Sequence, residues 1–129
     1  MANNYINIYK NNPTTGLSDG TLVSTGGDYT SPISFTLDAS QNESQKVKLA
    51  IRTTSGYTGT SVAISDQNDT NDRLKLCLTE NGTYADSLSI GSVSSVNTIF
   101  WAQASSSSTE NPQTDRSASF VVNAVIAAV

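Results

Sequence analysis

The sequence predicts an all-β protein with the architecture of an immunoglobulin-like antiparallel β-sandwich. Apolar and polar residues alternate in many short segments, which recur about every 8 to 12 residues with turn residues between them. No window shows the apolar spacing of a helix. Ser and Thr supply 36 of the 129 residues, as is typical of short strands joined by side-chain-bonded turns. An odd number of strands, about nine, and an aromatic-rich strand containing Trp101 favour this form. A jelly roll is the alternative.

The first half of the chain contains four predicted strands. Residues 5–10 alternate isoleucine with tyrosine and asparagine, and residues 21–24 form a short edge strand after a segment rich in glycine and proline. Residues 33–37 place three apolar side chains on one face. Residues 46–52 alternate apolar side chains with lysine and arginine, so we expect a strand whose basic face is solvated and keeps an exposed strand soluble.

The middle of the chain adds shorter segments. A loop is predicted over 53–60, and a short strand begins at residues 62–64. Leucine recurs at every second position over 74–78, which predicts another strand. Asn81-Gly82 predicts a type I′ hairpin turn, because both residues tolerate positive φ. The hairpin would return through a strand over 88–90.

The last third of the chain has the clearest strand patterns. Residues 98–104 form an apolar run, and residues 118–128 are apolar at every even position. The polar segment 105–116 separates the two runs and contains Pro112. We expect the runs to form a long antiparallel pair at the centre of the sandwich, with the even side chains of the last strand in the core.

Length and charge limit the possible classes of protein. With 129 residues the chain is predicted to form one domain over 1–129. Seven basic residues are scattered among eleven acidic ones, so we expect no nucleic-acid binding. No stretch reaches the roughly 18 apolar residues of a membrane-spanning helix, and the first residues predict no signal peptide. We expect a protein that is made in a cytoplasm, away from membranes.

The residues available for chemistry predict that the protein is not an enzyme and holds no cofactor. It has no histidine, so the commonest general base and the commonest zinc ligand are both missing. Nearly all eleven carboxylates fall in predicted loops, whereas a catalytic acid with a raised pKa needs an apolar pocket. The single Cys77 excludes an intramolecular disulfide, and only Arg73 and Lys75 lie near it to lower its pKa.

One acidic loop has the composition of a cation site. Asp66, Asp69 and Asp72 could offer carboxylate oxygens, which calcium prefers. Their spacing of three differs from the spacing of two in an EF-hand loop, and no glycine occupies the tight-turn position. We therefore expect an ordinary polar loop and name these residues only as the candidate metal ligands.

Partner contact is predicted at the C-terminal strand. Val121, Val125 and Val129 lie on the odd face, opposite the apolar even face. A strand that is apolar on one face and repeatedly valine on the other is typically covered on both sides, which one sandwich layer does not require. We expect these valines to contact another protein, with the exposed Tyr57 as a further contact residue.

The chain resembles the small immunoglobulin-like virion proteins of tailed bacteriophages and prophages of Gram-positive bacteria. The residues that carry the resemblance are 5–13, 19–24, 97–104 and the ending 112–129. The resemblance implies a structural role without catalytic residues. Such domains coat capsids as decoration proteins or sit on tails, sometimes touching cell-surface carbohydrate.

A capsid decoration protein is thus the expected function, and its partner would be the major capsid protein or another virion protein. The expected location is the virion, assembled in the host cytoplasm, with the protein as a homo-oligomer or in many copies on a lattice. One alternative is a tail-associated carbohydrate-binding or adhesion module that uses Tyr57 and the loop from Asp66 to Asp72 to bind a host surface glycan. Another is a subunit of the tail tube or baseplate.

Overall fold

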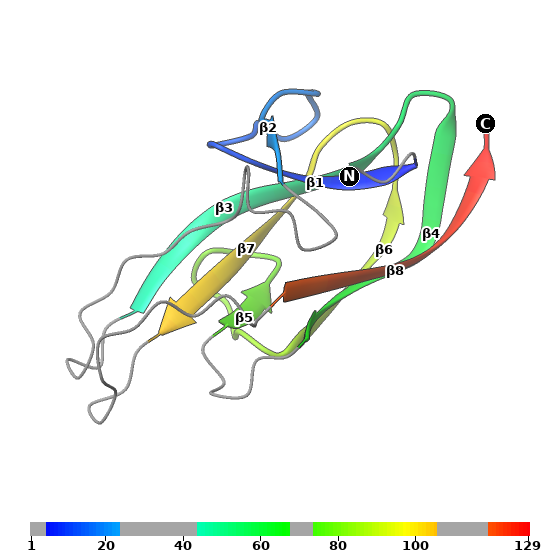
Figure 1. Cartoon of the computed structure of the whole chain (residues 1–129). Coiled ribbons are helices and arrows are strands. Elements are labelled where there is room, and N and C mark those ends of the chain that lie inside the picture. Colours follow the sequence, from blue (N-terminus) through cyan, green and yellow to red (C-terminus); the bar gives the residue numbers. More distant parts are fainter. Residues whose placement is uncertain (1–4, 24–43, 68–73, 106–118) are drawn as a thin grey trace.

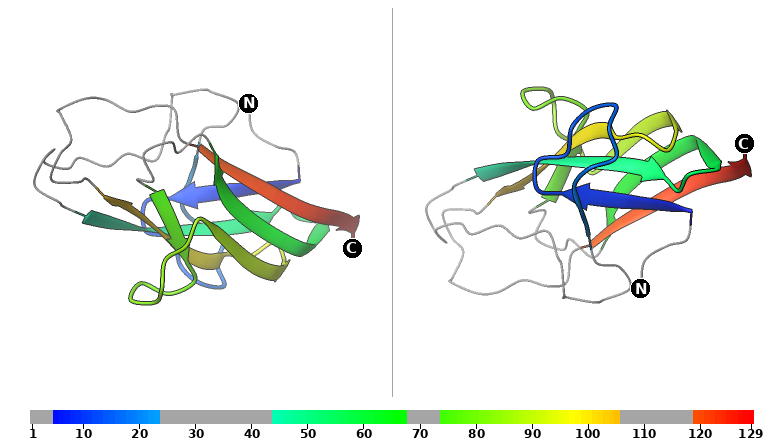
Figure 2. Two further views of the ribbon diagram at one scale, coloured as in Figure 1. Left: turned by 90° about the horizontal axis from the view of Figure 1, so that it is seen from below. Right: turned by 90° about the horizontal axis from the view of Figure 1, so that it is seen from above.

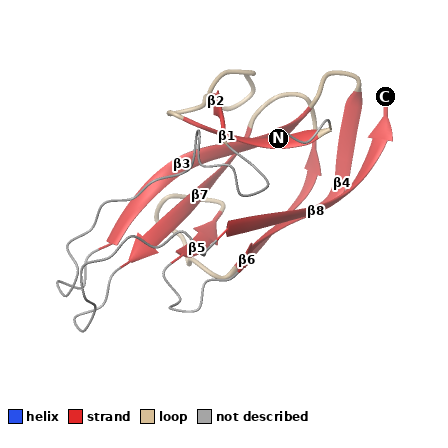
Figure 3. Cartoon of the chain, viewed as in Figure 1, coloured by secondary structure: helices blue, strands red, loops and turns tan. Residues whose placement is uncertain are grey.

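The protein forms two antiparallel β-sheets packed against each other, as the computed structural model shows (Figures 1 and 3). The structure describes residues 5–23, 44–67, 74–105 and 119–129, and these residues contain eight strands and no helix. The prediction of an all-β sandwich is therefore confirmed. Its immunoglobulin-like form stays a prediction.

One sheet has five strands in the order β2-β1-β3-β7-β5. Their bounds are β1 Ile6–Lys10, β2 Thr21–Leu22, β3 Ser44–Thr53, β5 Leu74–Cys77 and β7 Thr98–Ser105. The predictions of a first strand, of a short edge strand after it and of a strand with alternating apolar and basic side chains are confirmed by β1, β2 and β3. The predicted strand over 33–37 lies outside the described residues.

The second sheet has three strands in the order β6-β4-β8. Their bounds are β4 Tyr57–Gln67, β6 Ser87–Val93 and β8 Ser119–Ala128. Figure 2 shows this sheet lying across the five-stranded one. The loop predicted over 53–60 is wrong in extent, because the chain turns within 54–56 and β4 already begins at Tyr57.

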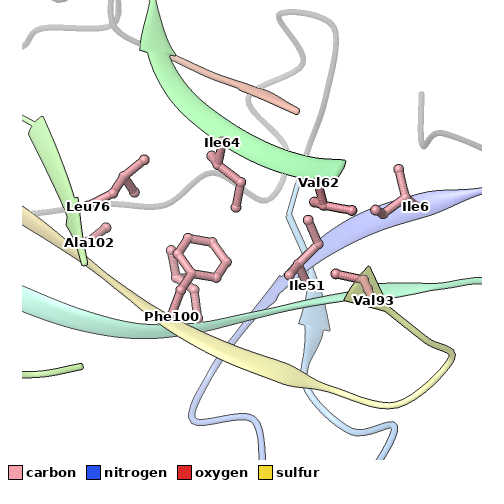
Figure 4. Close-up of a cluster of buried hydrophobic side chains, with 9 residues drawn as sticks. Ile6, Ile51, Val62, Ile64, Leu76, Val93, Phe100 and Ala102 are labelled. Carbon is pink, nitrogen blue, oxygen red and sulfur yellow. The ribbon is translucent and has the colours of Figure 1, made fainter. Parts of the chain in front are cut away.

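Side chains from both sheets form one core (Figure 4). Phe100 of β7 and its cross-strand partner Leu49 are fully buried, and Val62 and Ile64 of β4 cover them from the other sheet. Even-numbered side chains of β8 from Phe120 to Ile126 pack against this cluster, which confirms that face as a core face. Trp101, next to Phe100, lies on the opposite face and stays partly exposed.

The predicted pairing of the two C-terminal strands is wrong. Strand β7 pairs with β3 and β5, whereas β8 pairs with β4 in the other sheet. Alternation identifies a strand and its buried face, but it carries no information about which strand lies beside it. The core faces of β7 and β8 therefore belong to different layers, and the chain changes sheets between Ser105 and Ser119.

The predicted type I′ hairpin is also wrong. Neither Asn81 nor Gly82 has positive φ, and β5 and β6 belong to different sheets. Instead, the turn from Thr79 to Gly82 folds over β5, and a Cβ on Gly82 would lie 2.6 Å from Cys77 Sγ. Glycine at this position permits the close approach to the thiol of Cys77, so the absence of a Cβ matters more here than backbone freedom.

Candidate partner-contact surface

Among the residues that the structure describes, the outward side of the three-stranded sheet carries no charged side chain. We call this surface the uncharged face, and we assign its members from the strand register and the alternation of side chains. They are Thr58, Thr60, Ala63, Ser65, Ser87, Ser89, Val121, Asn123, Val125 and Ala127. Charged residues are depleted in the cores of protein interfaces, so this composition suits contact with another protein.

Two of the residues predicted to contact a partner, Val121 and Val125, belong to this face, and Val129 follows directly after β8. Val125 is 61% exposed, Val129 is 88% exposed, and Val121 is half-buried. Odd numbering along β8 places Val121 and Val125 on the outward side. The backbone N–H of Val129 donates a hydrogen bond to the carbonyl oxygen of Gly56, 2.9 Å away, so the end of the chain stays attached to the sheet.

Tyr57 lies elsewhere. Its register partner is Ala128, whose even number places it on the inward side of β8. There the ring of Tyr57 meets the ring of Tyr5 edge-on, with centroids 5.1 Å apart and planes at 75°. The sequence analysis grouped Tyr57 with the three valines, whereas the structure places Tyr57 on the face of the sheet opposite to Val121 and Val125.

Charge is distributed unequally between the two sheets. All five basic residues in the described part of the chain lie on strands of the five-stranded sheet: Lys10, Lys46, Lys48, Arg52 and Lys75. The three-stranded sheet carries only Asp66, at one end of β4. In the described part of the chain, the outward surfaces of the two layers therefore offer different chemistry, and that of the three-stranded sheet could lie against another protein without desolvating a charge.

The expectation of a fully solvated basic face is wrong at Arg52. Its Nη1 donates hydrogen bonds to the carbonyl oxygen of Asp19 at 2.6 Å and to Asn97 Oδ1 at 2.7 Å. The guanidinium also lies 3.5 Å from the centroid of the Tyr9 ring. Arg52 of β3 thus attaches the loop between β1 and β2 to the five-stranded sheet.

Asn97 completes this attachment. Its Nδ2 donates hydrogen bonds to the carbonyl oxygen of Thr14 at 2.9 Å and to Asp19 Oδ1 at 2.8 Å. The loop between β1 and β2 is thereby joined to the segment before β7, about 80 residues away in the chain, so its polar groups are used within the fold. These hydrogen bonds give the cluster a structural role.

Asp19 should make stability depend on pH. The backbone N–H and the hydroxyl of Thr14, and then Asn97, donate to its carboxylate and lower the pKa of Asp19 below its usual 3.8. Its contribution is present above the unfolded pKa and is lost as pH falls through the lower folded pKa. We expect Asp19→Asn to lower the Tm at pH 7, and the difference from wild type to shrink below about pH 4. Thermal unfolding across this pH range checks it, and a constant difference would contradict it.

Only one of the three candidate cation ligands lies within the described residues. Asp66 belongs to β4, where it pairs with Phe120, and Asp69 and Asp72 lie outside the described residues. Within the described ranges, no three acidic or thiol side chains gather in a way that could hold a metal ion. Asp66 and Tyr57 lie at opposite ends of β4, roughly 30 Å apart along the strand. Tyr57 and Asp66 therefore do not border one compact site.

Sequence reasoning missed the neighbours of the valines. Ala63 and Ser65 lie beside Asn123 and Val121, and Ser89 and Ser87 lie beyond them on β6. The available signal was the scarcity of charge over 57–67 and 87–93, but it could be used only once these strands were known to flank β8.

Comparison with protein families, with curated proteins and with solved structures finds no match to this chain. The described part of the chain contains no helix long and apolar enough to cross a membrane.

Proposed function

We propose that this chain is a non-enzymatic structural protein of a tailed-bacteriophage virion, and specifically a capsid decoration protein. The uncharged face is the observation that carries the proposal. It joins exposed valines to small polar side chains on three adjacent strands, which suits docking on another protein better than binding a small charged substrate. The resemblance of the sequence to virion proteins supplies the class of partner, a major capsid protein or another virion protein.

A decoration protein does not need a large contact area per copy. Many copies on one lattice gain avidity, provided that several contacts form at once. A face of small polar and apolar side chains can meet a repeated surface without burying charge. Attachment through the uncharged face would leave the basic outward side of the five-stranded sheet directed away from the particle.

Binding to particles tests the proposal. Purified protein is added to heads that lack it, and the bound copies are counted after sedimentation and located by electron microscopy. We expect a fixed number of copies in a symmetric arrangement on the head. Failure to bind heads, or absence of the protein from purified virions, would contradict the proposal.

Two lysine substitutions test the face itself. We expect Val125→Lys and Ala63→Lys each to reduce head binding at least tenfold, since each places a charge in the contact. Leu78→Lys is the matched control, because Leu78 is 45% exposed and lies outside the three-stranded sheet. Ala63→Lys leaves β8 unchanged, so loss of binding in both variants points to the face and not to one strand. Equal binding by all three variants would place the contact elsewhere.

A carbohydrate-binding module on the tail is the rival function, and the contact of the exposed Tyr5 with the half-buried Tyr57 is the observation that favours it. Aromatic rings with one polar end suit partly hydrated contacts. A pull-down with host cell-wall polysaccharide separates the two functions. Retention that is lost in Tyr57→Ala, together with no binding to heads, would favour the rival.

A further inference from the structure

We infer that the free edge of β8 pairs with β8 of a second copy of this chain, antiparallel about a two-fold axis, and joins the two three-stranded sheets into one sheet of six strands. In the described part of the chain, β8 is the last strand of its sheet and no strand lies beyond it (Figures 1 and 2). It is ten residues long and contains no charged residue and no proline. Such an edge is a ready template for pairing with another chain.

The hydrogen-bond pattern shows which backbone groups of β8 are available. The N–H of Val129 donates to Gly56, the residue opposite it in the register, so odd residues of β8 direct their backbone groups toward β4. Even residues, from Phe120 to Ala128, therefore direct their N–H and C=O groups to the free edge. The register shift in this pair lies in β4, between Thr60 and Ala63, so the alternation along β8 is uninterrupted.

The other three sheet edges are protected. Strand β2 has only two residues. At the edge of β5, Leu76 exchanges two backbone hydrogen bonds with Ala85, at 2.7 and 2.9 Å. Strand β6 is irregular in its pairing with β4, and Gly91 there has φ +90°. Short strands, covering segments and bulges are the ways in which proteins protect an edge, and among the described residues β8 has none of them.

Charge favours a second copy as the occupant. An uncharged strand can pair with itself without placing like charges opposite each other, which would be destabilising. Antiparallel pairing centred on Ala124 places Phe120 opposite Ala128 of the second copy. The two Asp66 side chains, beside Phe120 in each copy, then lie at opposite ends of the interface, roughly 27 Å apart and well beyond the Debye length.

This register also matches side chains of suitable size. Val122 would lie beside Ile126 of the second copy on the core side, and Val121 beside Ala127 on the outward side. The uncharged face would continue across the axis and double in area. The inference adds a partner to the proposed function but does not rest on it, since purified protein without any virion component tests it.

Sedimentation equilibrium of the purified chain is the first measurement. We expect wild type to have the mass of two chains, and Ala124→Pro to have the mass of one. Proline removes the N–H of Ala124, which points to the free edge, and proline is tolerated in that position of an edge strand. Ala124→Ser is the matched control, because it changes the same residue but keeps the N–H, and we expect it to stay dimeric.

Hydrogen exchange gives a second readout that does not depend on the folding of a proline variant. In wild type, the amides of Val122, Ala124 and Ile126 should exchange slowly at concentrations where the dimer forms and faster on dilution. The amides of odd residues, which bond to β4, should stay protected at both concentrations. A monomer at every concentration, or a dimer that Ala124→Pro leaves intact, would overturn the inference, whether or not the chain binds phage heads.

Discussion

Phe100→Ala should destabilise the protein by about 3 to 5 kcal/mol, the range for removing a buried aromatic ring. Phe100 is fully buried and is among the largest buried side chains of the core. Its ring lies between the two layers, with Val62 and Ile64 in the facing sheet (Figure 4). Leu49 is its cross-strand partner on β3. Alanine would leave a cavity that both layers border, and paired strands can collapse into it only partly.

Trp101→Ala is the matched control for this prediction. The two residues are adjacent on β7 and both are aromatic, but Trp101 lies on the outward face and is partly exposed. We expect its loss to cost less than the loss of Phe100, because part of its surface already contacts water. Urea unfolding followed by circular dichroism measures both, since Trp101 is the only tryptophan and its fluorescence is lost in the control. A larger cost for Trp101→Ala would contradict the assignment of the core face.

The contrast between these two residues shows what the sequence could predict about the fold. Alternation in residues 98–104 and 118–128 identifies two strands, and on the last strand it identifies the buried face. Pairing depends on backbone groups that every residue carries, so the sequence could not show that β7 joins β3 and β5 while β8 joins β4. The Asn81-Gly82 turn failed for a related reason. The local preference of Asn-Gly for a hairpin turn was outweighed because β5 and β6, on either side of it, belong to different sheets.

The contact surface was predictable only in part. Val121, Val125 and Val129 stand out in the sequence because valine recurs on the face opposite the core. Their neighbours on β4 and β6 are serines, threonines and alanines that carry no signal singly, and the surface becomes visible only when the register brings them together. For Arg52 the sequence predicted the position of the residue but not its hydrogen-bond partners. Its position on a solvated face was predicted, but its bonds to a loop more than 30 residues away in the chain were not.

Asn97→Ala should lower the free energy of unfolding by about 2 kcal/mol, since leaving a buried polar group without its partner is destabilising by about 1 to 3 kcal/mol. Asn97 is only 3% exposed, and its amide donates to Thr14 and Asp19 while its oxygen accepts from Arg52. Alanine removes all of these hydrogen bonds, together with the longer one from the amide to the carbonyl oxygen of Asp19 at 3.4 Å. The loop between β1 and β2 would then keep its backbone bonds to residue 97 and its bond from Arg52 to the carbonyl oxygen of Asp19.

Asn97→Asp separates the loss of donors from the loss of side-chain volume. It keeps the shape of the side chain and an oxygen for Arg52, but it replaces the amide donor with a carboxylate facing that of Asp19. At pH 7 we expect Asn97→Asp to be at least as destabilising as Asn97→Ala, because two carboxylates at hydrogen-bond distance repel each other. Below about pH 4 protonation should relieve the repulsion and bring the stability of Asn97→Asp closer to that of wild type. Urea unfolding of both variants at the two pH values measures this, and an Asn97→Asp deficit that does not change with pH would show that the Asn97 amide does not face the carboxylate of Asp19.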